Sequence, residues 1–223
     1  MLLLALTMSG GLHAQKGVTT FGLQVKPVIP LSFFDPLVTV EAPPLRGSME
    51  LTGGLAFGMV VRHGLTKSIS FETGINQITR RYDFGVANDT SGYEEIGQLR
   101  YVGYEIPLLA MVYIRLGQKT WMNNALGFSL DMYPSDARSD IEEGRAYVFR
   151  TSWIQMGVVG NMGIEYRTER SGYFYLGATY HRPFNDMAVA DLTWYDTNYL
   201  PSVLRTSLDG SYLTLDVRYF FHE

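Results

Sequence analysis

The chain has 223 residues, a formal net charge of −4 at pH 7 and no cysteine. The lack of cysteine excludes disulfides, thiolate metal sites and cysteine nucleophiles, and a chain without a basic excess is a poor match for nucleic acid. The length suffices for one soluble domain or for one membrane barrel.

The N-terminus has the pattern of an export signal. Residues 1–8 are almost all apolar, and small residues then lead to Leu12, His13 and Ala14. This order is typical of a signal peptide, although no Lys or Arg precedes the apolar run. A buried strand or helix is the alternative. We predict a signal peptide over residues 1–14, a barrel domain over residues 15–223 and export to the cell outer membrane.

A period of two residues recurs along the rest of the chain. Near the C-terminus, for example, Leu213, Leu215 and Val217 alternate with Thr214 and Asp216. Such alternation predicts strands with one apolar and one polar face. The most apolar stretch, residues 106–114, matches the 9–11 residues that a tilted strand needs to cross a bilayer, not the about 20 of a helix. Eight runs show the period: 18–28, 51–62 (with Leu51 placed on the same face as Leu55), 68–78, 101–115, 122–132, 154–166, 173–181 and 212–221.

The charged side chains of these runs lie on the less apolar face. A soluble β-sandwich would expose that face to water, whereas a membrane barrel turns it into the lumen and presents the apolar face to lipid. An eight-stranded barrel is just wide enough for side chains to fill its interior. We therefore expect the charges to pair in a structural plug. The predicted lumen network comprises Lys26, Arg62, Glu72, Glu105, Glu165, Asp216 and Arg218.

Short and long connections between the runs alternate, which favours the barrel over the sandwich. Outer-membrane barrels have tight periplasmic turns and longer extracellular loops. The pattern predicts an all-β, eight-stranded, antiparallel up-and-down transmembrane β-barrel with both ends of its chain on the periplasmic side. The short connections are 63–67, 117–120 and 168–172, and the long ones are 29–50, 79–100, 133–151 and 183–210.

Three segments resemble a known group of proteins. Residues 104–113, with the sequence YEIPLLAMVY, and residues 177–185 are similar to strands of PorT-like and related outer-membrane barrels of Bacteroidota, which are small OmpA-type barrels. Residues 212–221 resemble the C-terminal strand that the barrel-assembly machinery reads. The resemblance implies the fold, the membrane and that machinery as a partner during biogenesis. PorT itself is linked to type IX secretion.

The sequence offers little for catalysis. It contains no G-x-S-x-G, H-E-x-x-H or P-loop motif. His181 is expected to point inward at the extracellular rim, with Asp186 and Asp191 close in sequence. We predict a non-enzymatic protein without catalytic residues, cofactor or metal, which has a structural, anchoring or surface-interaction role. The alternatives are a rim enzyme that acts on envelope lipid or peptide, with His181 as its base instead of a solvated histidine, and a component of a secretion or transport assembly.

The long connections suggest contacts with other molecules. The last one carries Phe184, Trp194, Tyr195 and Tyr199, and exposed aromatic rings either anchor a partner or fold the loop onto itself. Acidic residues cluster in the others and are interpreted as solvated surface, with Ca²⁺ binding as the alternative. The expected partners are outer-membrane lipids, lipopolysaccharide and an unidentified envelope protein.

Overall fold

The computed structural model describes residues 17–30 and 37–221, so the predicted signal peptide lies outside the described residues. In these ranges the chain forms thirteen β-strands and no helix. It accordingly has no helix, within these ranges, that is long and apolar enough to cross a bilayer. The strands are β1 (Thr19–Ile29), β2 (Leu37–Ala42), β3 (Leu45–Gly64), β4 (Ile69–Asn88), β5 (Tyr93–Arg115), β6 (Thr120–Met132), β7 (Ala137–Ile141), β8 (Gly144–Arg150), β9 (Ile154–Arg167), β10 (Tyr173–Pro183), β11 (Ala188–Tyr195), β12 (Pro201–Leu208) and β13 (Tyr212–Phe220).

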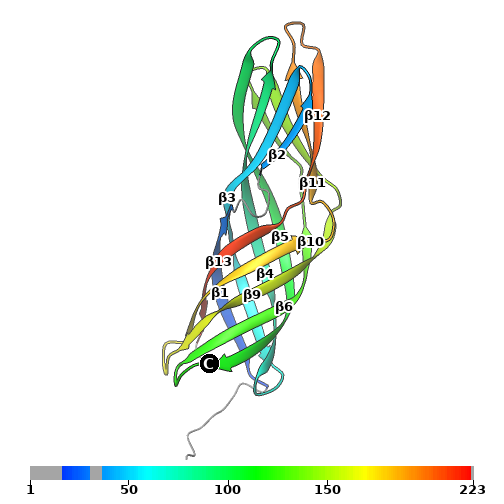
Figure 1. Ribbon diagram of the computed structural model, residues 1–223. Helices are drawn as coiled ribbons and strands as arrows, with labels where there is room; N and C mark the ends of the chain where they lie inside the picture. The colour runs from blue at the N-terminus through cyan, green and yellow to red at the C-terminus, as the bar shows by residue number, and fades with distance from the viewer. Residues whose placement is uncertain (1–16, 31–36, 222–223) are drawn as a thin grey trace, which may run out of the picture.

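Eight of these strands close into a barrel (Figure 1). They pair antiparallel in the order β1, β13, β10, β9, β6, β5, β4 and β3, and β3 pairs with β1 to complete the ring. At the closure, Gly22 of β1 lies opposite Phe220 on one side and Val60 on the other. Closure leaves no barrel strand with an unpaired edge. The predicted eight-stranded, antiparallel up-and-down barrel is therefore confirmed.

Three short turns join the barrel strands at one end, which we call the turn end. They cover residues 65–68, 116–119 and 168–172, close to the predicted short connections. Two are held by threonine hydroxyls: Thr66 Oγ1 accepts the backbone N–H of Ile69, and Thr168 Oγ1 accepts that of Ser171. These local hydrogen bonds explain why so few residues suffice to reverse the chain.

The prediction of four long loops at the opposite end is wrong. Strands β3, β4 and β5 continue well beyond the barrel, and β2, β7, β8, β11 and β12 lie beside them. We call this assembly, with the outer halves of β3–β5, the distal extension. Its two sheets, β2–β5 and β12–β11–β8–β7, meet where β7 lies against β5 and β12 against β2. The extension forms the upper half of the molecule in Figure 1.

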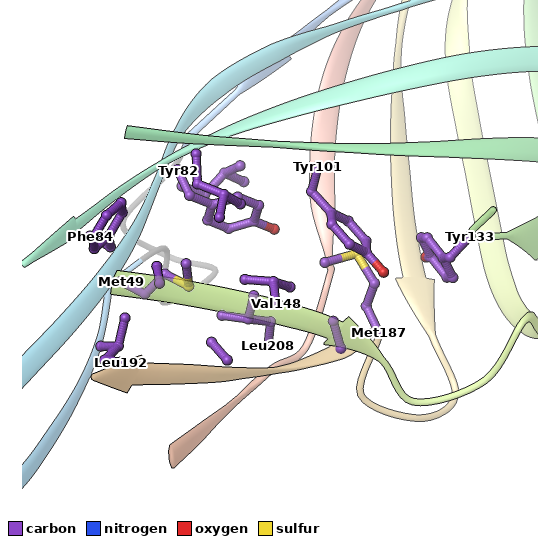
Figure 2. Close-up of a cluster of buried hydrophobic side chains, with 14 of the residues drawn as sticks. Met49, Tyr82, Phe84, Tyr101, Tyr133, Val148, Met187, Leu192 and Leu208 are labelled. Carbon is purple, nitrogen blue, oxygen red and sulfur yellow. The ribbon is translucent and has the colours of Figure 1, made fainter. Parts of the chain in front are cut away.

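An apolar core holds the two sheets of the extension together. Met49, Phe84, Val148, Met187 and Leu192 are at least nine-tenths buried in it. Figure 2 shows these side chains directed into the space between the sheets. Burial of a side chain of this size stabilises a fold by about 1.5–3 kcal/mol. The extension is thus folded as an ordinary β-sandwich around its own core.

The distribution of apolar residues reverses along a single strand. In the barrel half of β4, Phe71 points outward and is exposed, while Glu72 points inward and is buried. Beyond the buried Arg80, Phe84 points inward and is fully buried, and Asp83 lies on the outer face. A lipid-facing wall needs the first arrangement and a water-facing sheet needs the second. The reversal therefore marks the level along the strand at which lipid around the outer face would be replaced by water.

A β-bulge on β3 corrects the predicted faces of that strand. The register with β4 shifts between Leu51 and Gly53, where Gly53 has a φ of 145°. The extra residue moves the side chains on its two sides to opposite faces. Leu51 is consequently buried in the core of the extension, whereas Leu55 points outward. The prediction that Leu51 shares a face with Leu55 is wrong, because simple alternation takes no account of a bulge.

Candidate functional site in the barrel lumen

The barrel strands direct a set of charged side chains into the lumen. Every residue of the sequence-predicted lumen network is at most 3% exposed. Because alternate residues of a strand face one side, each strand delivers its charges to the same interior. The seven residues are Lys26 of β1, Arg62 of β3, Glu72 of β4, Glu105 of β5, Glu165 of β9 and Asp216 and Arg218 of β13.

Two arginines and three carboxylates form the centre of this network. Arg62 contacts Glu72 with Nη2 at 2.9 Å and Glu165 with Nη1 at 2.5 Å. Arg218 contacts Glu72 with Nη1 at 2.6 Å and Asp216 with Nη2 at 2.6 Å. Glu72 thus bridges both guanidinium groups, and each arginine binds two carboxylates. Charge-assisted hydrogen bonds of this kind are the strong ones in proteins.

Aromatic rings and one further arginine close the turn end of the lumen. Arg167 donates from Nε to Glu165 at 2.6 Å, and its guanidinium lies 4.9 Å from the ring centre of Trp121. The guanidinium of Arg62 lies 4.0 Å from the ring centre of Phe220. Such cation–π contacts stabilise a desolvated cation. They surround the network on the side that faces the short turns.

The middle of the lumen is occupied by hydrogen bonds to Asp216. Thr179 and Thr214 donate their hydroxyls to its two oxygens, and Asn161 donates its amide to Oδ2 at 3.0 Å. The ammonium group of Lys26 lies 4.0 Å from the same carboxylate. A buried carboxylate with this many partners has little need of water.

Glu105 of the predicted network belongs to a second cluster, closer to the distal extension. Nε2 of His181 lies 2.9 Å from Asp131 Oδ2, 2.9 Å from Ser129 Oγ and 3.8 Å from Glu105 Oε2. Tyr212 donates its hydroxyl to Glu105 Oε2 at 2.5 Å and stacks on the His181 ring with the centres 4.7 Å apart. All five side chains are buried, with His181 and Ser129 fully so.

This second cluster contains the donor set of a metal site. One ligand atom each from Glu105, Asp131 and His181 lies within 4.8 Å of the others, the one such grouping among the described residues. Carboxylate and imidazole donors suit Zn²⁺ and related ions. However, the carboxylates already accept hydrogen bonds, and the guanidinium of Arg80 lies 4.9 Å from the ring centre of Tyr212. Tyr212 donates to Glu105, so this guanidinium lies beside the cluster, where its charge would repel a divalent cation.

The same cluster lacks the geometry of a hydrolytic triad. In a serine triad the hydroxyl and the carboxylate bind opposite nitrogens of the histidine, so that a proton passes from one side while the other is held. Here Ser129 and Asp131 both contact Nε2 of His181. The second ring nitrogen, Nδ1, has no hydrogen-bond partner among the described residues, so no carboxylate orients the ring from the side opposite Ser129.

The formal charges of the lumen cancel when His181 is neutral. Five cationic side chains face five carboxylates within the described barrel, which makes the interior electrically neutral. Burying charges without partners would cost several kcal/mol each, so this balance is a condition for a closed lumen. The cations are Lys26, Arg62, Arg80, Arg167 and Arg218, and the carboxylates are Glu72, Glu105, Asp131, Glu165 and Asp216.

The sequence prediction of the network missed three charged members of these clusters. Arg80 lies in the segment 79–100, which was predicted as a loop, so the inward direction of its side chain was not considered. Arg167 stands at the end of its strand. Asp131 lies on the less apolar face of its run, but the predicted network of three cations and four carboxylates already had an excess of negative charge. His181 points inward, as predicted. It is not at a solvent-exposed rim, however, because it is fully buried beneath the extension.

The four aromatic residues predicted as a loop contact surface do not come together. Phe184 is exposed on the barrel wall, 6.3 Å from the ring centre of Phe128. Trp194 packs partly buried against the core of the extension. Tyr195 stacks under the guanidinium of Arg145, and Tyr199 is 85% exposed. Only the last two remain near a common surface of the extension.

Acidic residues of the extension are bonded to neighbours in the same region. Asp140 accepts hydrogen bonds from Arg138 and Arg145, and these hold the pKa of Asp140 below its usual value. Tyr93 donates its hydroxyl to Glu95 at 2.5 Å, and burial followed by this hydrogen bond raises the pKa of Tyr93 to about 12. These contacts fit the interpretation of a paired, water-facing surface.

The fold is shared with a known outer-membrane protein. No family model matches the chain, and no curated protein matches it. The outer membrane protein OprG from Pseudomonas aeruginosa is 10% identical, covers 95% of this chain and 99% of its own, and has a TM-score of 0.56. The likeness shows a common outer-membrane barrel fold and nothing finer.

Two further solved structures match with TM-scores below 0.5, too low to show a common fold. The outer membrane protease OmpT from Escherichia coli is 10% identical, with a TM-score of 0.40 and coverage of 91% of this chain and 96% of its own. The translocator domain of the autotransporter NalP from Neisseria meningitidis is 13% identical, with a TM-score of 0.27 and coverage of 95% and 90%. The PorT-like resemblance stays a prediction.

Proposed function

We propose that this protein is an integral outer-membrane barrel with a closed lumen, which anchors the distal extension at the cell surface as an element for interaction. The observation that carries the proposal is the set of ion pairs and hydrogen bonds that fills the lumen, capped by the apolar core of the extension. A solute would have to break the ion pairs and then cross the core. Such an interior serves stability and anchoring better than conduction.

The outer wall of the barrel supports residence in a membrane. Large apolar side chains cover it on every barrel strand, among them Leu23, Phe57, Leu126 and Ile164, each at least 49% exposed. In water this surface would be a severe aggregation hazard, whereas lipid requires it. At the turn end, Tyr219 contacts other exposed rings in the manner of an interfacial aromatic girdle. The turn end then faces the periplasm and the extension faces outward.

The second cluster favours a structural role over an enzymatic one. Its histidine is fully buried, and Ser129 and Asp131 share one nitrogen of His181. A rim enzyme acting on envelope lipid or peptide would need access to that ring. Within this proposal, lipopolysaccharide surrounds the barrel, and the barrel-assembly machinery inserts the barrel into the membrane. The extension binds an envelope protein; membership of a type IX-like secretion assembly is the alternative role.

The absence of cysteine allows a direct test of insertion and orientation. We would introduce Tyr199→Cys in the extension and, as the matched control, Arg170→Cys in the last short turn; both positions are exposed. A membrane-impermeant maleimide should label Tyr199→Cys on intact cells and Arg170→Cys only after lysis. Equal labelling of both on intact cells, or recovery of the protein in the soluble fraction, would reject the proposed orientation or location.

Conductance tests the closed lumen separately. The purified barrel, inserted into planar bilayers, should show no steady ion current, because the ion pairs fill its interior. Bilayers that receive the same detergent without protein provide the baseline. Steady single-channel steps from the wild-type protein would refute the closed lumen while leaving the membrane assignment in place.

A further inference from the structure

The outer wall of the barrel contains an apolar hollow on one side. Its volume is about 430 Å³, and it opens toward the surroundings of the barrel and not toward the lumen. The side chains around it come from four adjacent strands: Leu23 and Val25 of β1, Phe57 and Met59 of β3, Ile75 of β4 and Tyr104 of β5. A depression of this kind in a lipid-facing wall has the chemistry to hold a hydrocarbon chain.

Two arginines lie above the hollow on the same strands. Arg81 of β4 and Arg100 of β5 stand directly opposite each other, and both are exposed. Like charges in this position repel and destabilise a sheet. Among the described residues, no carboxylate oxygen lies within 4.0 Å of either guanidinium. The pair therefore presents on the outer face two positive charges that no described carboxylate binds in an ion pair.

The position of this pair matches a lipid headgroup. Gln77 and Tyr104, at the rim of the hollow, are a register pair of the same two strands, four residues closer to the turn end. At about 3.3 Å per residue the two levels are separated by roughly 13 Å along the strands. Arg81 also directly follows Arg80, where β4 changes from a lipid-facing to a water-facing pattern. The arginines thus stand at the boundary where phosphate groups of a bilayer lie.

The next outward row of the sheet limits the site on its outer side. Glu50 of β3 and Asp83 of β4 are a register pair, and Asp83 lies two residues beyond Arg81. Their negative charges repel an anion, so that a phosphate is confined to the level of the arginines. The order along the wall is consequently apolar hollow, cationic pair and acidic row.

From this order we infer that the outer face of β1, β3, β4 and β5 is a binding site for a phosphorylated glycolipid of the outer leaflet, with an acyl chain in the hollow and a phosphate between Arg81 and Arg100. Arginine recognises phosphate oxygens through its planar fork of donors. The inference rests on the proposed location in the outer membrane. It goes beyond that location because it assigns a defined lipid position to one side of the barrel.

The test is a titration of the folded, full-length mature barrel with bisphosphorylated lipid A in dodecyl maltoside, a detergent without phosphate, followed by native mass spectrometry. The double variant Arg81→Gln/Arg100→Gln removes the cationic pair. The matched control, Lys67→Gln/Arg170→Gln, removes the same charge from two exposed turn residues at the other end of the barrel. A third variant, Val25→Trp, fills the hollow. Migration on gels with and without boiling verifies that each variant is folded.

We expect the wild-type barrel to retain one lipid A molecule and the arginine variant to bind it at least about tenfold more weakly, equivalent to about 1.4 kcal/mol. The hollow-filling variant should also lose binding, and the control variant should not. Dephosphorylated lipid A should bind as weakly to the wild type as lipid A binds to the arginine variant. Equal binding by the folded arginine variant, or displacement of lipid A by inorganic phosphate alone, would overturn the site. A protein that does not form a heat-modifiable barrel would instead refute the proposed function.

Discussion

Neutralising Glu72 should strongly destabilise the barrel, because this carboxylate bridges two buried arginines. Its Oε2 accepts from Nε and Nη2 of Arg62 at 3.1 and 2.9 Å, and its Oε1 accepts from Nη1 of Arg218 at 2.6 Å. Glu72→Gln keeps the shape, removes the charge and leaves the lumen with one excess cation. Removing one partner of a buried ion pair costs about 3–5 kcal/mol. We expect the free energy of unfolding to fall by that amount.

A double-mutant cycle isolates the electrostatic part of this loss. Arg218→Gln alone should cost a similar amount, whereas Glu72→Gln combined with Arg218→Gln restores neutrality. The double variant should therefore be more stable than the sum of the two single losses predicts, by about 2 kcal/mol. Urea unfolding in lipid vesicles, followed by tryptophan fluorescence, measures all four free energies. Trp121 is a suitable probe because Arg167, a member of the network, lies over its ring.

Two results would refute this reasoning. One is a loss below about 1 kcal/mol for Glu72→Gln, a value typical of an exposed pair; the other is strict additivity in the cycle. The exposed pair of Arg46 and Asp89 in the distal extension provides the matched control. Asp89→Asn should leave the unfolding of the barrel nearly unchanged, because water screens that pair.

Three further predictions address other parts of the molecule. Glu105→Ala should lower the free energy of unfolding by about 3 kcal/mol or more, because it leaves buried donors without their acceptor; unchanged urea unfolding would contradict the pairing. Gly58→Ala should cost about 1–3 kcal/mol in the same assay, since a Cβ atom there would collide with the backbone oxygen of Ile75. Tyr93, with its raised pKa, should help to hold the extension together below about pH 10 and lose that effect as the pH rises to about 12; protease resistance of the extension should fall more in the wild type than in Tyr93→Phe, in which other tyrosines with a raised pKa, such as Tyr147, still ionise.

The barrel was predictable because each of its strands obeys one simple rule. Residues of one parity face lipid and those of the other face the lumen, so alternation and charge placement identify both surfaces. The same rule placed residues such as Arg62 and Glu165 inside, where the structure joins them at 2.5 Å. Sequence spacing contains no information on which charges of different strands meet. That depends on the register and tilt of the strands, which alternation leaves open.

The distal extension was not predicted from the sequence, and the reason is physical. Its strands expose polar and bury apolar residues, and three of them, β3, β4 and β5, are outer continuations of barrel strands. On β4 the segment after Ile78 was therefore interpreted as a loop, although it forms ten further strand residues up to Asn88. On β3 the bulge near Gly53 shifted the parity at the same level. Both errors lie at the level where a strand leaves the lipid-facing barrel and enters the water-facing extension.

The change from a lipid-facing to a water-facing pattern along these strands also explains why the lumen is closed and not only narrow. An open pore would need a continuous polar interior from end to end, as in larger barrels. Here the interior is ionic up to the level of Arg80 and apolar beyond it, where Tyr82 and Phe84 of the same strand enter the core. Water that solvated the ionic part would meet the apolar core at one end and the rings around Arg62 and Arg167 at the other. For Arg62, Arg218 and the carboxylates that they bind, ion pairs consequently replace water as the solvation of the charge, whereas the guanidinium of Arg80 lies against the ring of Tyr212. The sandwich that covers these groups therefore contributes to the closed barrel together with the ion pairs.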